Sequence, residues 1–192
     1  MRITITKAPK GKDIEFSTQP QPQDFEVVYR TSEPCGMLGC WGPDVCNTQG
    51  VAVRFTSDSG YYLKKLGLWF MTNTSPGVHP EVVITLRNDR DDGINSMPGD
   101  SIYEEWTLRI SAENWIPVCE QLESVRTPYL EKGTGYWIVA ESGEPCGDDG
   151  VWAMAGSSAG FSAYNDGPGT PWSQGGEGAV PATIVWGIPP VE

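Results

Sequence analysis

The sequence predicts an all-β protein, an antiparallel β-sandwich of jelly-roll type. Short runs rich in β-branched and aromatic residues recur about every eight to fifteen residues along the chain. Turn-forming residues separate these runs, and the chain contains 23 glycines and 16 prolines. No window shows helical periodicity with capping residues, and the best candidate, residues 111–115, is at most one turn.

The expected strands follow from alternation of apolar and polar residues, which places alternate side chains on one face. Val51, Val53 and Phe55 face one way, and the same pattern recurs at Leu66 and Leu68. The predicted strands are residues 25–29, 51–55, 61–63, 66–70, 82–87, 102–110, 115–118, 136–140, 151–155 and 183–186. Residues 88–100 are expected to form a polar loop.

The chain length of 192 residues fits one sandwich domain. Residues 1–24 are expected to form an extended N-terminal segment or edge strand, because the polar Pro/Gln run at 18–23 cannot continue a central strand. Residues 25–192 then form a single domain, with a Cys-rich insertion at 32–49.

The charge of the chain excludes two classes of partner. The formal net charge is −12 and the sequence pI is about 4.4. Such a surface repels phosphate, so we expect neither a nucleic-acid partner nor binding to anionic membranes. No run of 18 apolar residues occurs, so we expect no membrane insertion, and the first residues lack the apolar core of a signal peptide.

The five cysteines predict disulfide-stapled loops. The local candidates are Cys35–Cys46 and Cys35–Cys40, and the long-range candidate is Cys119–Cys146. The sequence does not decide the connectivity, and one cysteine remains over. Zinc binding and free thiols are the alternatives, although the wide cysteine spacings and the single distant His79 do not suit a zinc site.

The order of several short motifs resembles a group of bacterial exported proteins. An A-x-x-F strand lies at 52–55, a Y-x-L segment at 61–66, a V-x-L-R strand at 83–87, an acidic loop ending in Pro-Gly at 89–99 and an L-x-x-G-T-x-Y-W strand at 130–137. This order resembles choice-of-anchor domains, which often precede a PEP-CTERM sorting tail. The resemblance implies a jelly-roll-like sandwich on a secreted or cell-surface protein, with the signal peptide outside this sequence, and it implies no catalytic residues. The Cys-rich insertion departs from the pattern.

The acidic loop is a candidate calcium site, with Asp89, Asp91, Asp92 and Asn95 as ligands. Calcium takes six to eight oxygen ligands from such loops, but this one lacks the ligand spacing of an EF-hand. A solvated turn is the alternative. A second acidic loop at 144–150 is expected to be a turn rather than a metal site. The acidic loop therefore makes structural calcium the candidate cofactor of this sequence.

Aromatic residues beside Gly/Pro loops are candidates for stacking on sugar rings. We expect a carbohydrate site to use some of Trp152, Tyr164, Asp166 and Trp172. The alternative is that these aromatic residues pack the loops against the end of the sandwich.

A catalytic site is not expected. Glu104 and Glu105 are adjacent on a predicted strand and therefore point to opposite faces, which prevents them from acting together. His79 is the single histidine, and the sequence contains no G-x-S-x-G nucleophile elbow with which it could form a catalytic triad. The sequence thus predicts a non-catalytic extracellular or cell-surface module that binds a glycan. The alternatives are a glycan-active enzyme that uses loop carboxylates and a self-assembling envelope component that pairs through the edge strand at 25–29.

Overall fold

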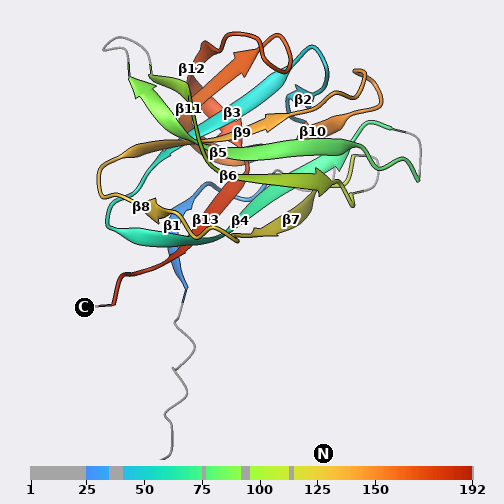
Figure 1. The fold of residues 1–192 in the computed structure, drawn as a ribbon. Helices are drawn as coiled ribbons and strands as arrows, with labels where there is room; N and C mark the ends of the chain where they lie inside the picture. The colour runs from blue at the N-terminus through green and yellow to red at the C-terminus, as the bar shows by residue number, and fades with distance from the viewer. Residues whose placement is uncertain (1–24, 35–40, 75–76, 92–95, 113–114, 192) are drawn as a thin grey trace, which may run out of the picture.

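The structure is a computed structural model, and it describes residues 25–34, 41–74, 77–91, 96–112 and 115–191. Within these residues every regular element is a β-strand, and all strand pairs are antiparallel. The strands form two sheets packed face to face, one above the other in Figure 1. The predicted all-β sandwich is confirmed.

The seven-stranded sheet is built around the long strand β4. Its strands are β1 (Glu26–Arg30), β13 (Thr183–Ile188), β4 (Tyr61–Thr72), β10 (Gly150–Trp152) and β2 (Asp44–Val45), with β7 (Val118–Glu123) and β8 (Tyr129–Leu130) also pairing with β4. The two strands expected at residues 61–63 and 66–70 are therefore one continuous strand.

The six-stranded sheet forms the second layer of the sandwich. Its order is β12 (Ser173–Pro181), β11 (Met154–Asn165), β3 (Gly50–Thr56), β9 (Gly135–Glu141), β5 (Glu81–Asp91) and β6 (Ser96–Arg109). The chain passes repeatedly between the two sheets, from β3 to β4, from β4 to β5 and from β6 to β7. Such crossing is typical of jelly-roll-like sandwiches.

The main hydrophobic core fills the space between the sheets, as the alternation patterns predict. Val51, Val53 and Phe55 of β3 lie in it together with Leu66 and Leu68 of β4. Phe70 of β4 stacks on a tryptophan of β10, Trp152, with 5.7 Å between the ring centroids. Apolar alternation therefore fixes which face of each strand points inward.

Residues 88–100 were expected to form a polar loop, but most of them belong to strands β5 and β6. Strand β5 continues to Asp91 and β6 begins at Ser96, and these two residues pair across the hairpin. Polar side chains are compatible with strands here because Asp89 and its neighbours form hydrogen bonds of their own. Strands β11 and β12 were also not expected, because their Gly-, Ser- and Ala-rich sequences carry little apolar alternation.

One disulfide joins Cys46 to Cys146, with a Cα–Cα distance of 5.1 Å and 100 residues between them. It ties the loop between β9 and β10 to the end of β2. The predicted Cys119–Cys146 pair is therefore wrong, and so is the predicted Cys35–Cys46 pair; Cys119 forms no disulfide among the described residues. Cys35 and Cys40 lie outside the described residues. None of the described residues belongs to a helix long and apolar enough to cross a membrane.

Candidate functional site

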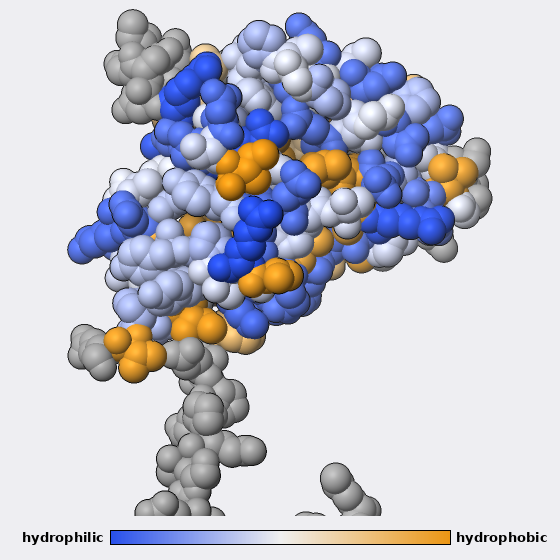
Figure 2. Space-filling view, in the orientation of Figure 1, coloured by the Kyte–Doolittle hydropathy of each residue, from blue (hydrophilic) through white to orange (hydrophobic). Residues whose placement is uncertain are grey.

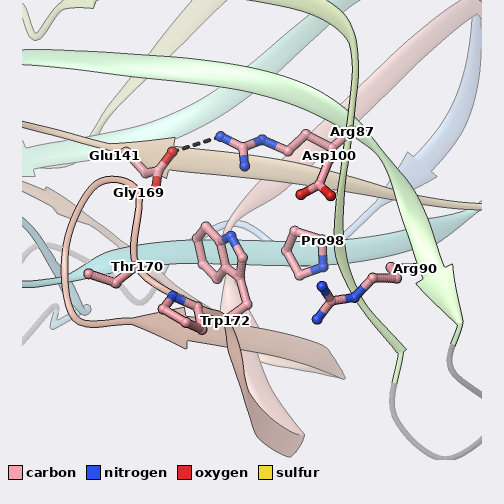
Figure 3. A pocket seen from close by; sticks show the side chains of 9 residues that line it. Arg87, Arg90, Pro98, Asp100, Glu141, Gly169, Thr170 and Trp172 are labelled. Atoms are coloured by element: carbon pink, nitrogen blue, oxygen red, sulfur yellow. Dashed lines mark hydrogen bonds and ion pairs between the residues drawn. The ribbon is translucent and has the colours of Figure 1, made fainter.

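A groove lies on the outer face of the six-stranded sheet, between β5, β6, β9 and the loop that leads from β11 to β12. Two adjoining hollows of about 320 and 360 Å³ form it, and both are lined by Arg87 and Glu141. Figure 3 shows the indole of Trp172 in the middle of the first hollow, with Arg87 and Glu141 on one side and Pro98 and Arg90 on another.

Strand alternation places the charged pair on the groove floor. Ile84 and Leu86 of β5 point into the core, so Thr85 and Arg87 point outward. On the neighbouring strand β9, Ala140 points inward and the next residue, Glu141, points outward. Arg87 Nη2 donates to Glu141 Oε2 at 2.7 Å, and Arg87 Nε donates to Thr85 Oγ1 at 2.8 Å. Both charged side chains are about 15% exposed, so the pair is held firmly rather than being a mobile surface contact.

Asn165, the last residue of β11, connects the groove floor to its wall. Its Nδ2 donates to Glu141 Oε1 at 2.9 Å, while its Oδ1 accepts from the backbone N–H of Gly50 at 2.7 Å and of Gly167 at 3.2 Å. The buried amide thus fixes the carboxylate of Glu141 and the start of the loop together. Both oxygens of Glu141 are engaged by protein donors.

The loop at 166–172 forms the wall and presents Trp172. Gly167 and Gly169 adopt φ values of 104° and 77°, which only glycine adopts readily. Thr170 closes the turn, since its Oγ1 donates to the carbonyl of Gly167 at 2.7 Å. The turn brings the half-buried Trp172 onto a small apolar cluster on the outer face of the sheet. That cluster consists of Ala52, Trp137, Val139 and Ala163.

Asp89 lies outside the groove lining and binds Trp137, a member of the apolar cluster under Trp172. Its Oδ1 accepts from Ser96 Oγ at 2.6 Å and from Trp137 Nε1 at 3.0 Å, and its Oδ2 accepts from Arg54 Nε at 2.7 Å. Burial favours the neutral form of this carboxyl, but the hydrogen bonds from Ser96, Trp137 and Arg54 and the charge of Arg54 outweigh it. The pKa of Asp89 is therefore lowered.

The groove offers charges of both signs at its rim. Arg90 and Asp100 are exposed, line the first hollow and, among the described residues, make no ion pair. Glu105 lines the second hollow. The site therefore combines an aromatic ring, a fixed ion pair and three further charged groups, of which Arg90 can donate hydrogen bonds and Asp100 and Glu105 can accept them.

Of the four residues predicted to bind a sugar, Trp172 lines the groove. Trp152 does not, because it is completely buried between the sheets and its Nε1 donates to the carbonyl of Ala182 at 3.1 Å. The expectation that Trp152 is a loop aromatic is wrong. Tyr164 is half-buried against the main core, and Asp166 is exposed near the start of the wall loop without lining either hollow.

Of the four predicted calcium ligands, Asp89 is the one whose side chain the structure describes. Asp89 uses its carboxylate oxygens to accept from Ser96, Trp137 and Arg54. Asp91 pairs through its backbone at the end of β5, and Asp92 and Asn95 lie outside the described residues. Within the described parts of the chain, no three His, Cys, Asp or Glu side chains come together as such a metal site would require.

Glu104 and Glu105 point to opposite faces of β6, as predicted. Glu104 is buried, and it accepts hydrogen bonds from Ser124 Oγ and from the backbone N–H groups of Val125 and Arg126. It therefore holds the connection between β7 and β8 rather than serving a reaction. Glu105 is exposed.

The residues of the groove that the sequence did not single out are Arg87, Arg90, Asp100 and Glu141. A signal for Arg87 and Glu141 is present, because each directly follows a mainly apolar run of its strand, at 82–86 and 136–140. The strand pairing that brings them together is not visible in the local sequence. The chain matches no protein-family model, and a comparison with curated proteins gives no match.

Proposed function

We propose that the protein is a non-catalytic extracellular module that binds a glycan in the groove beside Trp172. The observation that carries the proposal is the position of a half-buried indole beside the fixed Arg87–Glu141 pair. Sugar rings present apolar C–H faces and a rim of hydroxyls, which suit one aromatic surface and a few convergent polar groups.

The groove is organised before any ligand arrives. Arg87 is held by Thr85 and Glu141, and Glu141 is held in turn by Asn165. Charged groups that are already oriented form short hydrogen bonds to hydroxyls at little cost in side-chain entropy. A rigid floor therefore favours binding of a hydroxyl-rich ligand.

The charge balance of the groove favours an uncharged glycan. The hollow that contains Trp172 is lined by two cations, Arg87 and Arg90, and by two anions, Asp100 and Glu141. The second hollow adds Glu105, and the whole chain is strongly acidic. Polyanionic glycans would meet repulsion without a compensating basic surface.

The Cys46–Cys146 disulfide supports an extracellular location, because disulfides persist in oxidising compartments. The proposal of a secreted or cell-surface protein of the choice-of-anchor kind rests on this bond together with the order of sequence motifs described above.

The two alternatives have less support. In an enzyme of the glycosidase kind, one carboxyl group must donate a proton and another must act as base or nucleophile. Glu141 has both oxygens bound by Arg87 and Asn165, which suits it to positioning. Self-assembly through β1 is opposed by the irregular register between Val27 and Tyr29, since such bulges protect an edge from pairing. The face of the molecule seen in Figure 2 is mainly hydrophilic, with hydrophobic residues in small separate groups.

A glycan array followed by calorimetry tests the proposal. We expect the wild-type protein to bind a neutral oligosaccharide or polysaccharide, and Trp172→Ala to weaken binding at least about tenfold. Asp100→Ala provides a second variant, since this exposed residue lines the groove without supporting the fold. Trp41→Ala is the matched control, because Trp41 is 58% exposed and lies outside the groove lining.

Binding by none of the array glycans, or binding that both groove variants leave unchanged, would contradict the proposal. Release of shorter sugars from the bound glycan would show instead that the protein is an enzyme.

A further inference from the structure

A buried carboxylate lies at the opposite side of the sandwich, next to the disulfide. Asp149 directly precedes β10 and is fully buried. Its Oδ1 accepts from Asn73 Nδ2 at 2.8 Å and from the backbone N–H of Gly147 at 2.7 Å. Its Oδ2 is also buried, and no described protein group donates to it. Burying a carboxylate oxygen without a partner lowers the free energy of unfolding, so a positively charged partner at Oδ2 of Asp149 would stabilise the fold.

A second carboxylate, that of Asp44, projects from the same face of the seven-stranded sheet. Asp44 of β2 pairs with Val151 of β10, and Val151 lies two residues after Asp149. Residues that pair directly share a face, and residues diagonally across a ladder are also neighbours on that face. Strand β10 runs between β4 and β2, and Gly150, the residue after Asp149, pairs with Val45, so Asp44 lies diagonally across from Asp149 on the side away from Asn73.

Neither of the two carboxylates has a basic partner in the parts of the chain that the structure describes. Among the described residues, neither carboxylate forms an ion pair with a Lys, Arg or His side chain. Nearby, Cys46 follows β2 and is bonded to Cys146 of the loop that leads to Asp149. The disulfide therefore ties the segment that follows Asp44 to the loop that leads to Asp149.

We propose that Asp149 and Asp44 together bind a calcium ion on the outer face of the seven-stranded sheet. The ion would pair with Oδ2 of Asp149 and relieve the repulsion between the two carboxylates. Calcium suits the site because it accepts mixed sets of carboxylate, carbonyl and water oxygens in flexible geometry.

The small number of charged ligands predicts weak calcium binding. Two carboxylates are available, and the remaining ligands must be neutral oxygens from the backbone, amides or water. Calcium sites of extracellular modules bind with dissociation constants of about 0.1–1 mM, which matches such a set. Magnesium is expected to bind less well, because it loses its hydration water reluctantly and demands regular octahedral geometry.

The test is thermal unfolding of chelator-treated, full-length protein with added calcium chloride. At 10 mM calcium we expect the wild-type Tm to rise by about 3–10 °C, with a smaller rise in 10 mM magnesium. Asp149→Asn and Asp44→Asn should each remove most of the calcium response. Asp148→Asn is the matched control, because Asp148 is exposed in the same loop, and its response should equal that of the wild type.

Three outcomes would overturn the proposal. The wild-type Tm could fail to rise with calcium, which would mean that a proton or a water molecule satisfies Asp149. The Asp44→Asn variant, which should fold because Asp44 is only partly buried, could respond like the wild type. Finally, Asp92→Asn could abolish the response while both other variants keep it, which would place calcium in the loop between β5 and β6.

Discussion

Asn165 Nδ2 donates a 2.9 Å hydrogen bond to Oε1 of Glu141, and this bond joins the wall of the groove to its floor. The same amide also accepts from the backbone N–H of Gly167, at the start of the loop that carries Trp172. The position of the indole and the orientation of the Arg87–Glu141 pair therefore depend on one buried side chain.

Replacing Asn165 by Asp is expected to disturb both parts of the groove. The new carboxylate would face Glu141 and could no longer donate to it, so two like charges would repel at close range. We expect a loss of about 1–3 kcal/mol in the free energy of unfolding, together with weaker glycan binding. Urea unfolding measures the first effect. Asp166→Asn, at the exposed neighbouring position, is the control and should change stability by less than about 0.5 kcal/mol.

Acid should weaken the fold through Asp89. Its pKa is lowered below the ordinary value of 3.8 in the folded protein, so its stabilising contribution is complete above that value and is lost as the pH falls through the folded-state pKa. We expect the free energy of unfolding of the wild type to exceed that of Asp89→Asn by about 1–3 kcal/mol at pH 7. The difference should shrink as the pH falls below 3.8 and through the lowered folded-state pKa. A constant difference from pH 7 to pH 2.5 in urea unfolding would contradict this account of Asp89.

Glu104 is expected to matter for stability although it has no role in the groove. Glu104→Gln places an amide donor among groups that already donate, namely Ser124 Oγ and the N–H groups of Val125 and Arg126. The expected loss is about 1–3 kcal/mol in the free energy of unfolding. Glu105→Gln, on the exposed face of the same strand, should be nearly neutral. Equal effects of the two substitutions in chemical denaturation would show that the buried hydrogen bonds are not decisive.

The Cys46–Cys146 disulfide is expected to contribute strongly to stability. Breaking Cys46–Cys146 with Cys146→Ser should lower the free energy of unfolding by about 2–5 kcal/mol, because the bond closes a long loop in the unfolded chain. A reducing agent should lower the stability of the wild type but not that of the variant. Cys119→Ser should be neutral; if it had the larger effect, the assigned pairing would be wrong.

Much of the fold follows from local pattern. Strand β3 was predicted because Val51, Val53 and Phe55 alternate with residues of the opposite face, and this periodicity is visible in any short window. Strand β11 was not predicted, since its small residues give no such signal. Ala163 nevertheless lies in the outer apolar cluster against which Trp172 packs, and only the assembled sheet reveals why a small residue is suitable there.

The site was less predictable than the fold. Trp152 and Trp172 both lie beside Gly-rich segments in the sequence, yet the first is buried between the sheets and the second lines the groove. What distinguishes them is the pairing of β10 with β4, a contact between segments distant in sequence. The same holds for the Cys46–Cys146 bond and for the meeting of Arg87 with Glu141. Long-range pairing of this kind leaves no trace in local composition.

The most direct test of the glycan-binding groove is a titration followed by NMR of the tryptophan indole N–H groups. With a neutral glycan selected from the array, the indole signal of Trp172, assigned with Trp172→Phe, should shift progressively to saturation. The signals of Trp41 and Trp115, which are exposed outside the groove lining, should stay in place. A glycan that binds while the Trp172 signal remains unchanged would contradict the account, because the ligand would then lie elsewhere on the protein.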